Sequence, residues 1–555
     1  MSQVFDIAEA YVDALCALDP VLATTVGIPG HDDEVTDYSP DGVGARVALA
    51  RSTISALDGA AAGSDDDRLA AAVLRDRLGV VIEGFETGAP WRHLSNIDSP
   101  LSFIRMGFDL SPRETPDEWE RIAVRMAAVP RALEGFIASL RHGLATGVIA
   151  ARRQALACAA QAATLGGLEG GGDPYFVALA AGPHPEALTG CLRNAAEAAT
   201  AAYAGLAAFL RDEYAPRARA VDAVGRELYQ IGVHRYLGMS CDLEAVYTWG
   251  WEELHRIEAE MERVAELIAP GEGIAGTVAK LETDPARSVE GIGNLLAFLQ
   301  DLTDRTIEDL DGVHFDIPEP LRRIECCESP PGSSEAIYYT APSTDFSRPG
   351  RTWHPAHGRT RFPLWTEVST AYHEGAPGHH LQIGLLMTFG DRLTRFQRLM
   401  GRYPGHSEGW GLYAERLMEE LGYLENPDYL FGMLSAQAFR AMRVVVDIGL
   451  HLQLQVPAHE SYAPGRVWDW DLALPFVNRY IGRDEAFAQS ELVRYCGMPA
   501  QAICYKVGER AWLDIRSQMR ARLGSAFDLK RFHMSALNLG SLPLDVLQRE
   551  LLGAG

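Results

Sequence analysis

One segment, WTEVSTAYHEGAPGHHLQ at 365–382, constrains the fold of this 555-residue chain more than any other. It begins like the His-Glu-x-x-His helix of zinc proteases, in which histidines four residues apart bind the metal and the glutamate polarises water. His373 and Glu374 supply the first two residues of that pattern, but Pro377 stands where the second histidine belongs. The next histidines are adjacent, His379 and His380.

A straight helix cannot bring these histidines to one metal ion. At about 100° per residue, His379 lies roughly 240° around the axis from His373, and His380 lies about 10 Å further along it. The chain must therefore bend between the ligands. Pro377 and the glycine after it favour such a bend, because proline lacks a donor and clashes with the carbonyl four residues back. The alternative is a helix that ends at Gly375, with surface histidines in the following turn.

A third ligand is predicted in HSEGWGLYAERLMEE at 406–420. From Glu408 onward its apolar residues have helical spacing. A glutamate on a second helix, about 25–30 residues after the histidines, completes a His₂Glu zinc site with an open position for water. The alternative is a carboxylate favoured by the start of a helix. His406 and Glu415 are candidates to orient the ligands, with surface roles as the alternative.

Three motifs, HEGAPGHHLQ, EGWGLYAERL and PAQAICYKVG at 499–508, resemble the bacterial family catalogued as domain of unknown function 885. That family is similar to zincin metallopeptidases of the angiotensin-converting-enzyme, oligopeptidase and thermostable-carboxypeptidase type. Its motif is His-Glu-x-x-Pro-Gly-His, so the resemblance implies His379 rather than His380 as the second ligand and Glu408 as the third. It does not imply a substrate.

The remaining pattern predicts a mainly α protein, one two-lobed domain over 1–555 with a deep cleft and one small sheet. The resemblance implies that this domain is a zincin-like metallopeptidase. Its successive parts are 1–313, mostly helical; 314–364, where prolines interrupt helices and 336–340 is predicted as a strand; and 365–555, with the metal site and C-terminal helices. The predicted helical segments are 5–18, 42–89, 115–126, 130–147, 186–213, 217–237, 242–268, 408–424, 426–455, 484–495, 499–524 and 527–552, the last with a break near Pro543.

Composition limits the partners and the location. The formal net charge of −25 argues against nucleic acid and anionic membranes as partners. The N-terminal residues lack a secretory signal, and no run approaches the roughly 18 apolar residues that span a bilayer. The eight cysteines are scattered and predict neither a disulfide framework nor a cysteine zinc site. We expect a cytoplasmic protein; the sequence carries no sign of its oligomeric state.

The chemistry expected is hydrolysis of an amide bond in a short peptide or small amide, with one Zn²⁺ per chain. Glu374 is predicted as the general base that takes the proton of water and passes it to the leaving amine. Tyr505 is predicted to support the oxyanion, with packing against Trp512 as the alternative. Lys506 or a nearby arginine is expected to anchor substrate. Tyr338 and Tyr339, in the predicted strand, are expected to hold its extended backbone; the alternative is a small hairpin that covers the helical core.

Two other function classes are compatible with parts of this pattern. A hydrolase or lyase acting on a non-peptide metabolite would have the same metal site. A non-catalytic helical binding protein is disfavoured, because Glu374 has little structural use beside a metal. Mass spectrometry on a peptide panel would separate the first alternative from a peptidase.

Overall fold

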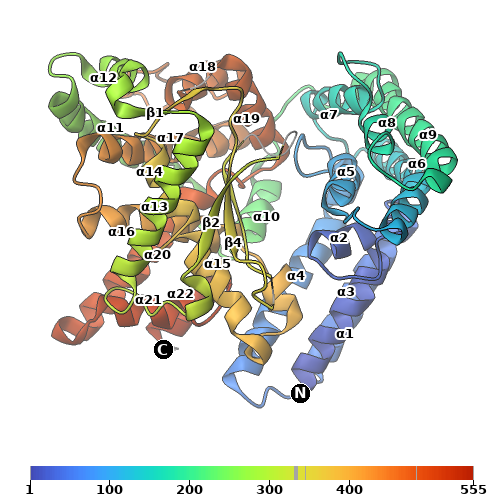
Figure 1. Ribbon diagram of the computed structural model, residues 1–555, viewed down its shortest axis with the longest axis horizontal. Coiled ribbons are helices and arrows are strands. Elements are labelled where there is room, and N and C mark those ends of the chain that lie inside the picture. The colour runs from blue at the N-terminus through green and yellow to red at the C-terminus, as the bar shows by residue number, and fades with distance from the viewer. Residues whose placement is uncertain (1, 331–335, 344, 483, 554–555) are drawn as a thin grey trace. The chain divides into compact units, whose positions relative to one another are not determined.

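The computed structural model describes residues 2–330, 336–343, 345–482 and 484–553, and helices make up most of it (Figure 1). The chain forms two compact units, each built from separate stretches of sequence. The first unit contains Met1–Gly232, Leu450–Leu474 and Arg483–Pro499; the second contains Val233–Gly449, Pro475–Gly482 and Ala500–Gly555. These bounds differ from the predicted consecutive parts 1–313, 314–364 and 365–555, because the chain crosses between the units several times.

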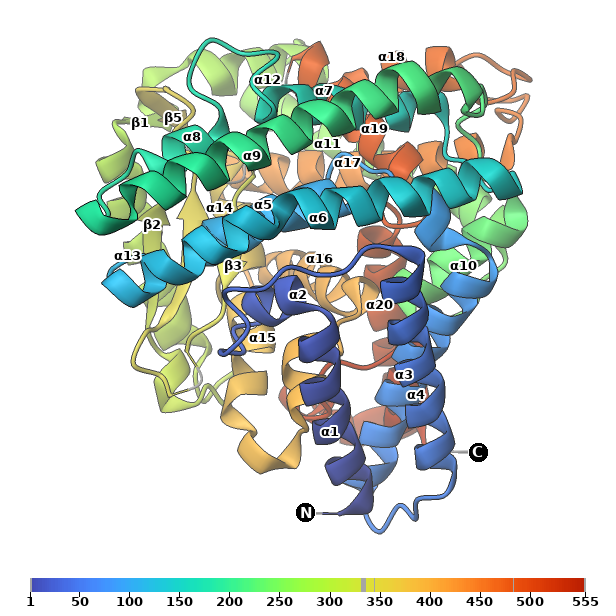
Figure 2. The ribbon, with the colours of Figure 1, turned by 90° about the vertical axis from the view of Figure 1, so that its right-hand side faces the viewer.

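The first unit is helical throughout its described elements. Its core lies among α5 to α9, where α6 and α9 run side by side (Figure 2). Three buried alanines of α9, Ala195, Ala196 and Ala199, leave room for this close packing. The helices are α1 Gln3–Leu18, α2 Pro20–Thr25, α3 Pro40–Asp58, α4 Asp65–Glu86, α5 Pro100–Leu110, α6 Pro116–Thr146, α7 Arg152–Leu165, α8 Tyr175–Ala180, α9 Thr189–Ala208 and α19 Glu485–Gly497. Three more, α10 Arg226–Leu237, α17 Pro427–Leu452 and α18 Trp470–Ile481, cross a unit boundary in sequence.

The predicted helix start at Thr115 is confirmed as a capping box. The Thr115 hydroxyl accepts from the Glu118 N–H, and the Glu118 carboxylate accepts from the Thr115 N–H at 2.8 Å. The predicted break before Pro130 is wrong, because Pro130 lies inside one continuous helix, α6. That helix ends at Gly147, whose φ of 77° is the left-handed conformation common at helix ends.

Three other predictions from the sequence need correction. Within the helix predicted at 217–237, residues 218–225 are not helical, because the Arg219 backbone pairs with Ala150 and Arg152. The helix predicted from 499 begins at Cys504, since Ala500 has a φ of 70° and donates its N–H to Asp447. Helix α18 was not predicted, because an internal proline, Pro475, interrupts its signal. Helices α5, α7, α12 Gly273–Thr283 and α13 Ile292–Leu310 also lie outside the predicted helical segments.

The second unit contains all five described strands and the remaining helices. The predicted strand is confirmed as β3, and the strands form two small sheets. The three-stranded sheet has the order β2-β4-β3, with β2 parallel and β3 antiparallel to β4; β1 and β5 pair antiparallel. In Figure 1, β2 and β4 lie side by side, and α13 packs against β2. The strands are β1 Ser288–Glu290, β2 Ile324–Glu328, β3 Tyr338–Thr340, β4 Gly350–His354 and β5 Arg361–Pro363.

The helices of the second unit are α11 Leu243–Ile268, α12 Gly273–Thr283, α13 Ile292–Leu310, α14 Glu367–Glu374, α15 His379–Thr388, α16 Pro404–Glu420, α20 Cys504–Leu523, α21 Leu529–Leu537 and α22 Leu544–Leu552. Short 3₁₀ and π turns occur across the two units at Ala89–Arg92, Glu186–Leu188, Phe209–Tyr214, Ala215–Arg217, Pro285–Arg287, Glu319–Leu321, Gly390–Arg392, Phe396–Met400 and Gly524–Ala526. The predicted mainly α class with a small sheet is confirmed.

Helices α16 and α20 cross in very close contact. A Cβ atom on Gly409 would collide with the backbone of Gly508, so only glycine permits this approach. Beside the crossing, the buried indoles of Trp410 and Trp512 pack edge to face, with ring centroids 4.9 Å apart. The packing holds α16, which carries Glu408, rigidly in the second unit.

Candidate metal centre

The segment between His373 and His379 separates two helices, α14 and α15. Helix α14 ends at Glu374 and α15 begins at His379, with the Ala376–Pro377 peptide bond cis between them. A Cβ on Gly378 would collide with the carbonyl oxygens of α14, so the chain turns back tightly here. The indole of Trp410 donates to the Pro377 carbonyl at 2.8 Å and ties this turn to α16.

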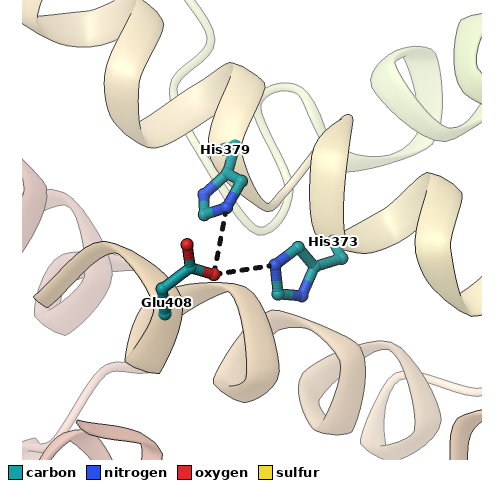
Figure 3. Close-up of side chains that lie close together, drawn as sticks. All are labelled: His373, His379 and Glu408. Carbon is teal, nitrogen blue, oxygen red and sulfur yellow. Dashed lines mark hydrogen bonds and ion pairs between the residues drawn. The ribbon is translucent and has the colours of Figure 1, made fainter. Parts of the chain in front are cut away.

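The turn brings together a buried cluster of two imidazoles and one carboxylate, His373, His379 and Glu408, here called the metal cluster (Figure 3). Glu408 Oε2 lies 3.3 Å from His373 Nε2 and 3.5 Å from His379 Nε2. Ligand atoms about 2.0–2.2 Å from a tetrahedral zinc ion are about 3.3–3.6 Å apart. The donor types and these two spacings therefore fit a zinc ion, and the three ligand atoms all lie within 4.8 Å of one another.

The His373 ring is held in place by Glu415 and by the backbone of α16 at Gly411. Its Nδ1 donates to Glu415 Oε1 at 2.8 Å, and the Ser369 hydroxyl donates to Glu415 Oε2 at 2.7 Å. The ring also lies against Gly411, where an added Cβ would come within 2.7 Å of Nε2. A carboxylate on Nδ1 directs Nε2 toward a metal, as in many histidine metal sites. Glu415 thus occupies the ligand-orienting position expected of it.

The charges of the cluster are strongly coupled without a metal. Burial alone would lower the pKa of His373, but hydrogen bonds to Glu408 and Glu415 raise it to about 10. Burial opposes ionisation of Glu408, yet hydrogen bonds from His373 and His379 hold its pKa well below the usual range. A proton on His373 therefore balances the carboxylates in the metal-free protein, and a cation can replace it.

Glu374, the predicted general base, is half-buried and accepts no hydrogen bond from the described part of the chain. Burial raises the pKa of its carboxyl, while the positive charges of His379, His373 and Arg440 oppose that rise. A carboxylate with an elevated pKa and no committed partner can accept a proton from water or substrate.

The neighbouring histidines lie outside the cluster. His380 Nε2 donates to the Leu321 carbonyl at 2.8 Å, and its Nδ1 accepts from the Tyr339 hydroxyl at 3.1 Å. Burial lowers the pKa of His380 to about 4, so both ring nitrogens are engaged in a neutral state. His406 Nδ1 accepts from Gln382 at 3.0 Å, and the ring packs on Trp512. The geometry does not support either histidine as a metal ligand.

The predicted substrate-binding residues have different surroundings. Tyr339 lies in β3, whose edge position and contact with α15 bring it to His380. The ring of Tyr338 stacks on Trp353 at 6.1 Å. Tyr505 is half-buried at the start of α20, and the Arg443 guanidinium lies 5.0 Å from its ring centroid.

Lys506 does not have the surroundings of a substrate anchor. It is only 2% exposed, and its ammonium donates to Gln437, Glu509 and, at 2.9 Å, Glu253. These four residues are here called the lysine cluster. Three oxygen partners satisfy all three N–H donors of an ammonium. The predicted anchoring role of Lys506 therefore needs correction, because no donor is left for substrate.

Two residues near the site were not predicted. Ser369 lies one helical turn before His373, so the helical pattern could have indicated it. Arg440, on α17, has no sequence signal that separates it from the other arginines of the chain. Only the fold brings its charge near Glu374 and Glu415.

Comparison with solved structures finds the same fold elsewhere. A putative lipoprotein from Colwellia psychrerythraea matches with a TM-score of 0.83 and 21% identity, over 99% of this chain and 98% of its own. A putative lipoprotein of unknown function from Shewanella oneidensis matches with a TM-score of 0.75 and 17% identity, over all of both chains. No curated protein matches. The model of the bacterial proteins of unknown function called DUF885 matches residues 20–551, and this chain therefore belongs to that family.

Proposed function

We propose that this protein is a zinc-dependent hydrolase, and specifically a metallopeptidase that cleaves an amide bond in short peptides. The observation that carries the proposal is the buried metal cluster with the uncommitted carboxylate of Glu374 next to it in sequence. A structural zinc site has no need of such a carboxylate, whereas hydrolysis needs a base beside the metal. The two-lobed, zincin-like body with a deep cleft is part of the same proposal.

The residues of the chain have distinct roles in this reaction. Zinc, when bound, supplies Lewis acidity that lowers the pKa of water from about 15.7 toward 7. Glu374 takes the proton of the attacking water on its carboxylate and delivers it to the leaving nitrogen. Glu415, supported by Ser369, keeps His373 oriented.

Two further roles complete the proposed site. Tyr505 donates its hydroxyl to the developing oxyanion, and an unchanged kcat in Tyr505→Phe would contradict this role. The backbone of β3, an edge strand against α15, holds the extended substrate by strand addition. Tyr339 serves this role indirectly, because its bond to His380 ties β3 to α15.

The test compares the two adjacent histidines. Purified protein is loaded with zinc, and bound metal is measured by mass spectrometry in wild type, His379→Ala and His380→Ala. We expect about one zinc ion per chain in wild type and His380→Ala and a large loss in His379→Ala. Hydrolysis of a mixed peptide library, followed by mass spectrometry, should stop with a chelator and return with zinc. Zinc binding without cleavage of any peptide would leave a metalloprotein and exclude the peptidase.

The location remains part of the proposal. No helix in the described part of the chain is long and apolar enough to cross a membrane. We propose a cytoplasmic protein that works without a membrane or nucleic-acid partner, although the two proteins of similar fold are named putative lipoproteins. Cell fractionation of the native protein tests this, and recovery in the membrane fraction would contradict it.

A further inference from the structure

Arg440 is a guanidinium whose hydrogen-bonding capacity is mostly unused. Its Nη1 donates to the Ala436 carbonyl of its own helix at 3.2 Å. Its Nε is buried and has no hydrogen-bond partner, and no carboxylate in the described part of the chain forms an ion pair with it. Arg440 is half-buried. A buried charged donor without an acceptor is costly, so its retention requires an explanation.

The fold brings the charge of Arg440 near the general base, Glu374. Near its start, α17 touches the approach to α14, because a Cβ on Gly432 would collide with the Trp365 carbonyl and meet Thr366 N. Arg440 lies eight residues, about two turns, after Gly432 on the same helix, and Glu374 is the last residue of α14. The electrostatic interaction of Arg440 with Glu374 and Glu415 agrees with this placement.

A second contact orients this part of α17 toward the metal cluster. Gln437, one turn before Arg440, donates to the Leu412 carbonyl of α16 at 3.5 Å. Leu412 follows Gly411, against which the His373 ring lies. Arg440 is thus on a helix that contacts α16 and the residues just before α14.

The unused donors have a particular geometry. Nε–H and the adjacent N–H of Nη2 form the side edge of the guanidinium, and this edge binds a carboxylate through two parallel hydrogen bonds. The two nearby protein carboxylates are not bonded to it. Glu415 is engaged by His373 and Ser369, and Glu374 is reserved for proton transfer in the proposed reaction.

We propose that Arg440 binds a carboxylate of the substrate close to the scissile amide bond. This inference rests on the proposed function and adds its substrate class: a peptide or amide that carries a negative charge beside the bond to be cut. The carboxylate comes either from a free C-terminus, which makes the enzyme an exopeptidase, or from an aspartate or glutamate side chain. Arg440 is a substrate-binding residue in either case.

The experiment uses matched tripeptide libraries on the zinc-loaded protein. One pair has free C-terminal carboxylates or C-terminal amides; the other has aspartate and glutamate or asparagine and glutamine, all with amidated ends. We expect wild type to cleave the charged member of one pair with a kcat/KM about 10- to 100-fold higher, the range for a charge-assisted bidentate contact. The pair that shows the preference identifies the source of the carboxylate.

The variants Arg440→Gln and Arg440→Lys test the residue itself. Arg440→Gln should lose the preference, because kcat/KM should fall about 10- to 100-fold further on the charged library than on the neutral one. Arg440→Lys should recover it only partly, because an ammonium lacks the two-pronged edge. The control is Arg416→Gln, since Arg416 is half-buried in the same unit but paired with Glu260 and Glu419; it should keep the preference.

Binding without turnover separates failure of this inference from failure of the proposed function. Equilibrium dialysis of the same libraries against zinc-loaded Glu374→Gln, with and without Arg440→Gln, measures carboxylate recognition directly. Arg440-dependent retention of charged peptides without hydrolysis by wild type would overturn the peptidase and keep the carboxylate site. Equal kcat/KM on charged and neutral libraries, or equal losses on both in Arg440→Gln, would overturn the site and keep the peptidase.

Discussion

The metal cluster and the lysine cluster are two buried groups of charges in the same unit, and they differ in how completely they are paired. In the lysine cluster every N–H of the Lys506 ammonium has an oxygen acceptor. Beside the metal cluster, Glu374 accepts no hydrogen bond from the described chain, and Arg440 leaves a buried donor without an acceptor. A buried charged group whose hydrogen bonds are all satisfied stabilises the fold, whereas a buried charged group with unsatisfied hydrogen bonds indicates a ligand.

Among variants at or beside the metal cluster, Glu374→Gln should have the largest effect, and this effect should be on kcat. The amide keeps the size of the side chain but cannot accept the proton of water, so we expect kcat to fall by about 10²- to 10⁴-fold. Bound zinc and the melting temperature should stay near wild type. The matched control is Glu509→Gln in the lysine cluster, which should lower stability but keep turnover per folded molecule. Near-normal kcat in Glu374→Gln would exclude this residue as the base.

Lys506→Met tests the other cluster. It removes the ammonium and leaves Glu509 buried without a cation, while Glu253 keeps only its ion pair with Arg256; loss of a buried partner costs about 3–5 kcal/mol in the free energy of unfolding. Denaturant titration measures this loss, and steady-state kinetics on the folded fraction should give an unchanged KM. A stable variant with a strongly raised KM would restore Lys506 as the substrate anchor and remove the contrast between the clusters.

Features that depend on neighbours in sequence could be predicted, whereas features that depend on tertiary contacts could not. The capping box at Thr115 and the mainly α class depend on neighbours in sequence, and they were predictable. So was a bend at Pro377, because two histidines six residues apart cannot share a face of a straight helix. Pro130 obeys the same local rule as Pro377, yet it remains inside α6. Tertiary packing overrides the local cost of proline there.

The candidate site shows this limit residue by residue. Sequence geometry left His379 and His380 open, and only the resemblance chose between them; the fold separates them, because Leu321 and Tyr339 engage His380. Lys506 has the chemistry of a substrate anchor in sequence, and its partners Gln437 and Glu253 come from distant helices. Arg440 is equally invisible in sequence. Contacts between residues distant in sequence, or the absence of such contacts, decide all three cases.

Glu415→Gln should weaken zinc binding by a smaller factor. Glutamine can still accept from His373 Nδ1 but carries no charge, so orientation is largely kept while the basicity of the ring falls. Loss of such a ligand-orienting partner costs about 10- to 100-fold in metal affinity. Competition with a chelating dye measures the dissociation constant. Ser369→Ala, which removes only the support of Glu415, should have a weaker effect in the same direction, and the reverse order of the two variants would contradict the arrangement.

The smallest effect concerns pH. Hydrogen bonds to Glu408 and Glu415 raise the pKa of His373 from 6.5 to about 10 in the metal-free protein, against the opposing effect of burial. At pH 8 the ring is therefore charged without zinc, but it must lose the proton from Nε2 to bind the ion. Zinc binding should then release at least about one proton, and the apparent affinity should rise about tenfold per pH unit between pH 7 and 9. Calorimetry in buffers of different ionisation enthalpy counts the protons. Glu415→Gln removes one of the carboxylates that raise this pKa, so zinc binding to this variant should release fewer protons at pH 8. A zinc affinity independent of pH would mean that His373 is already neutral before the metal binds.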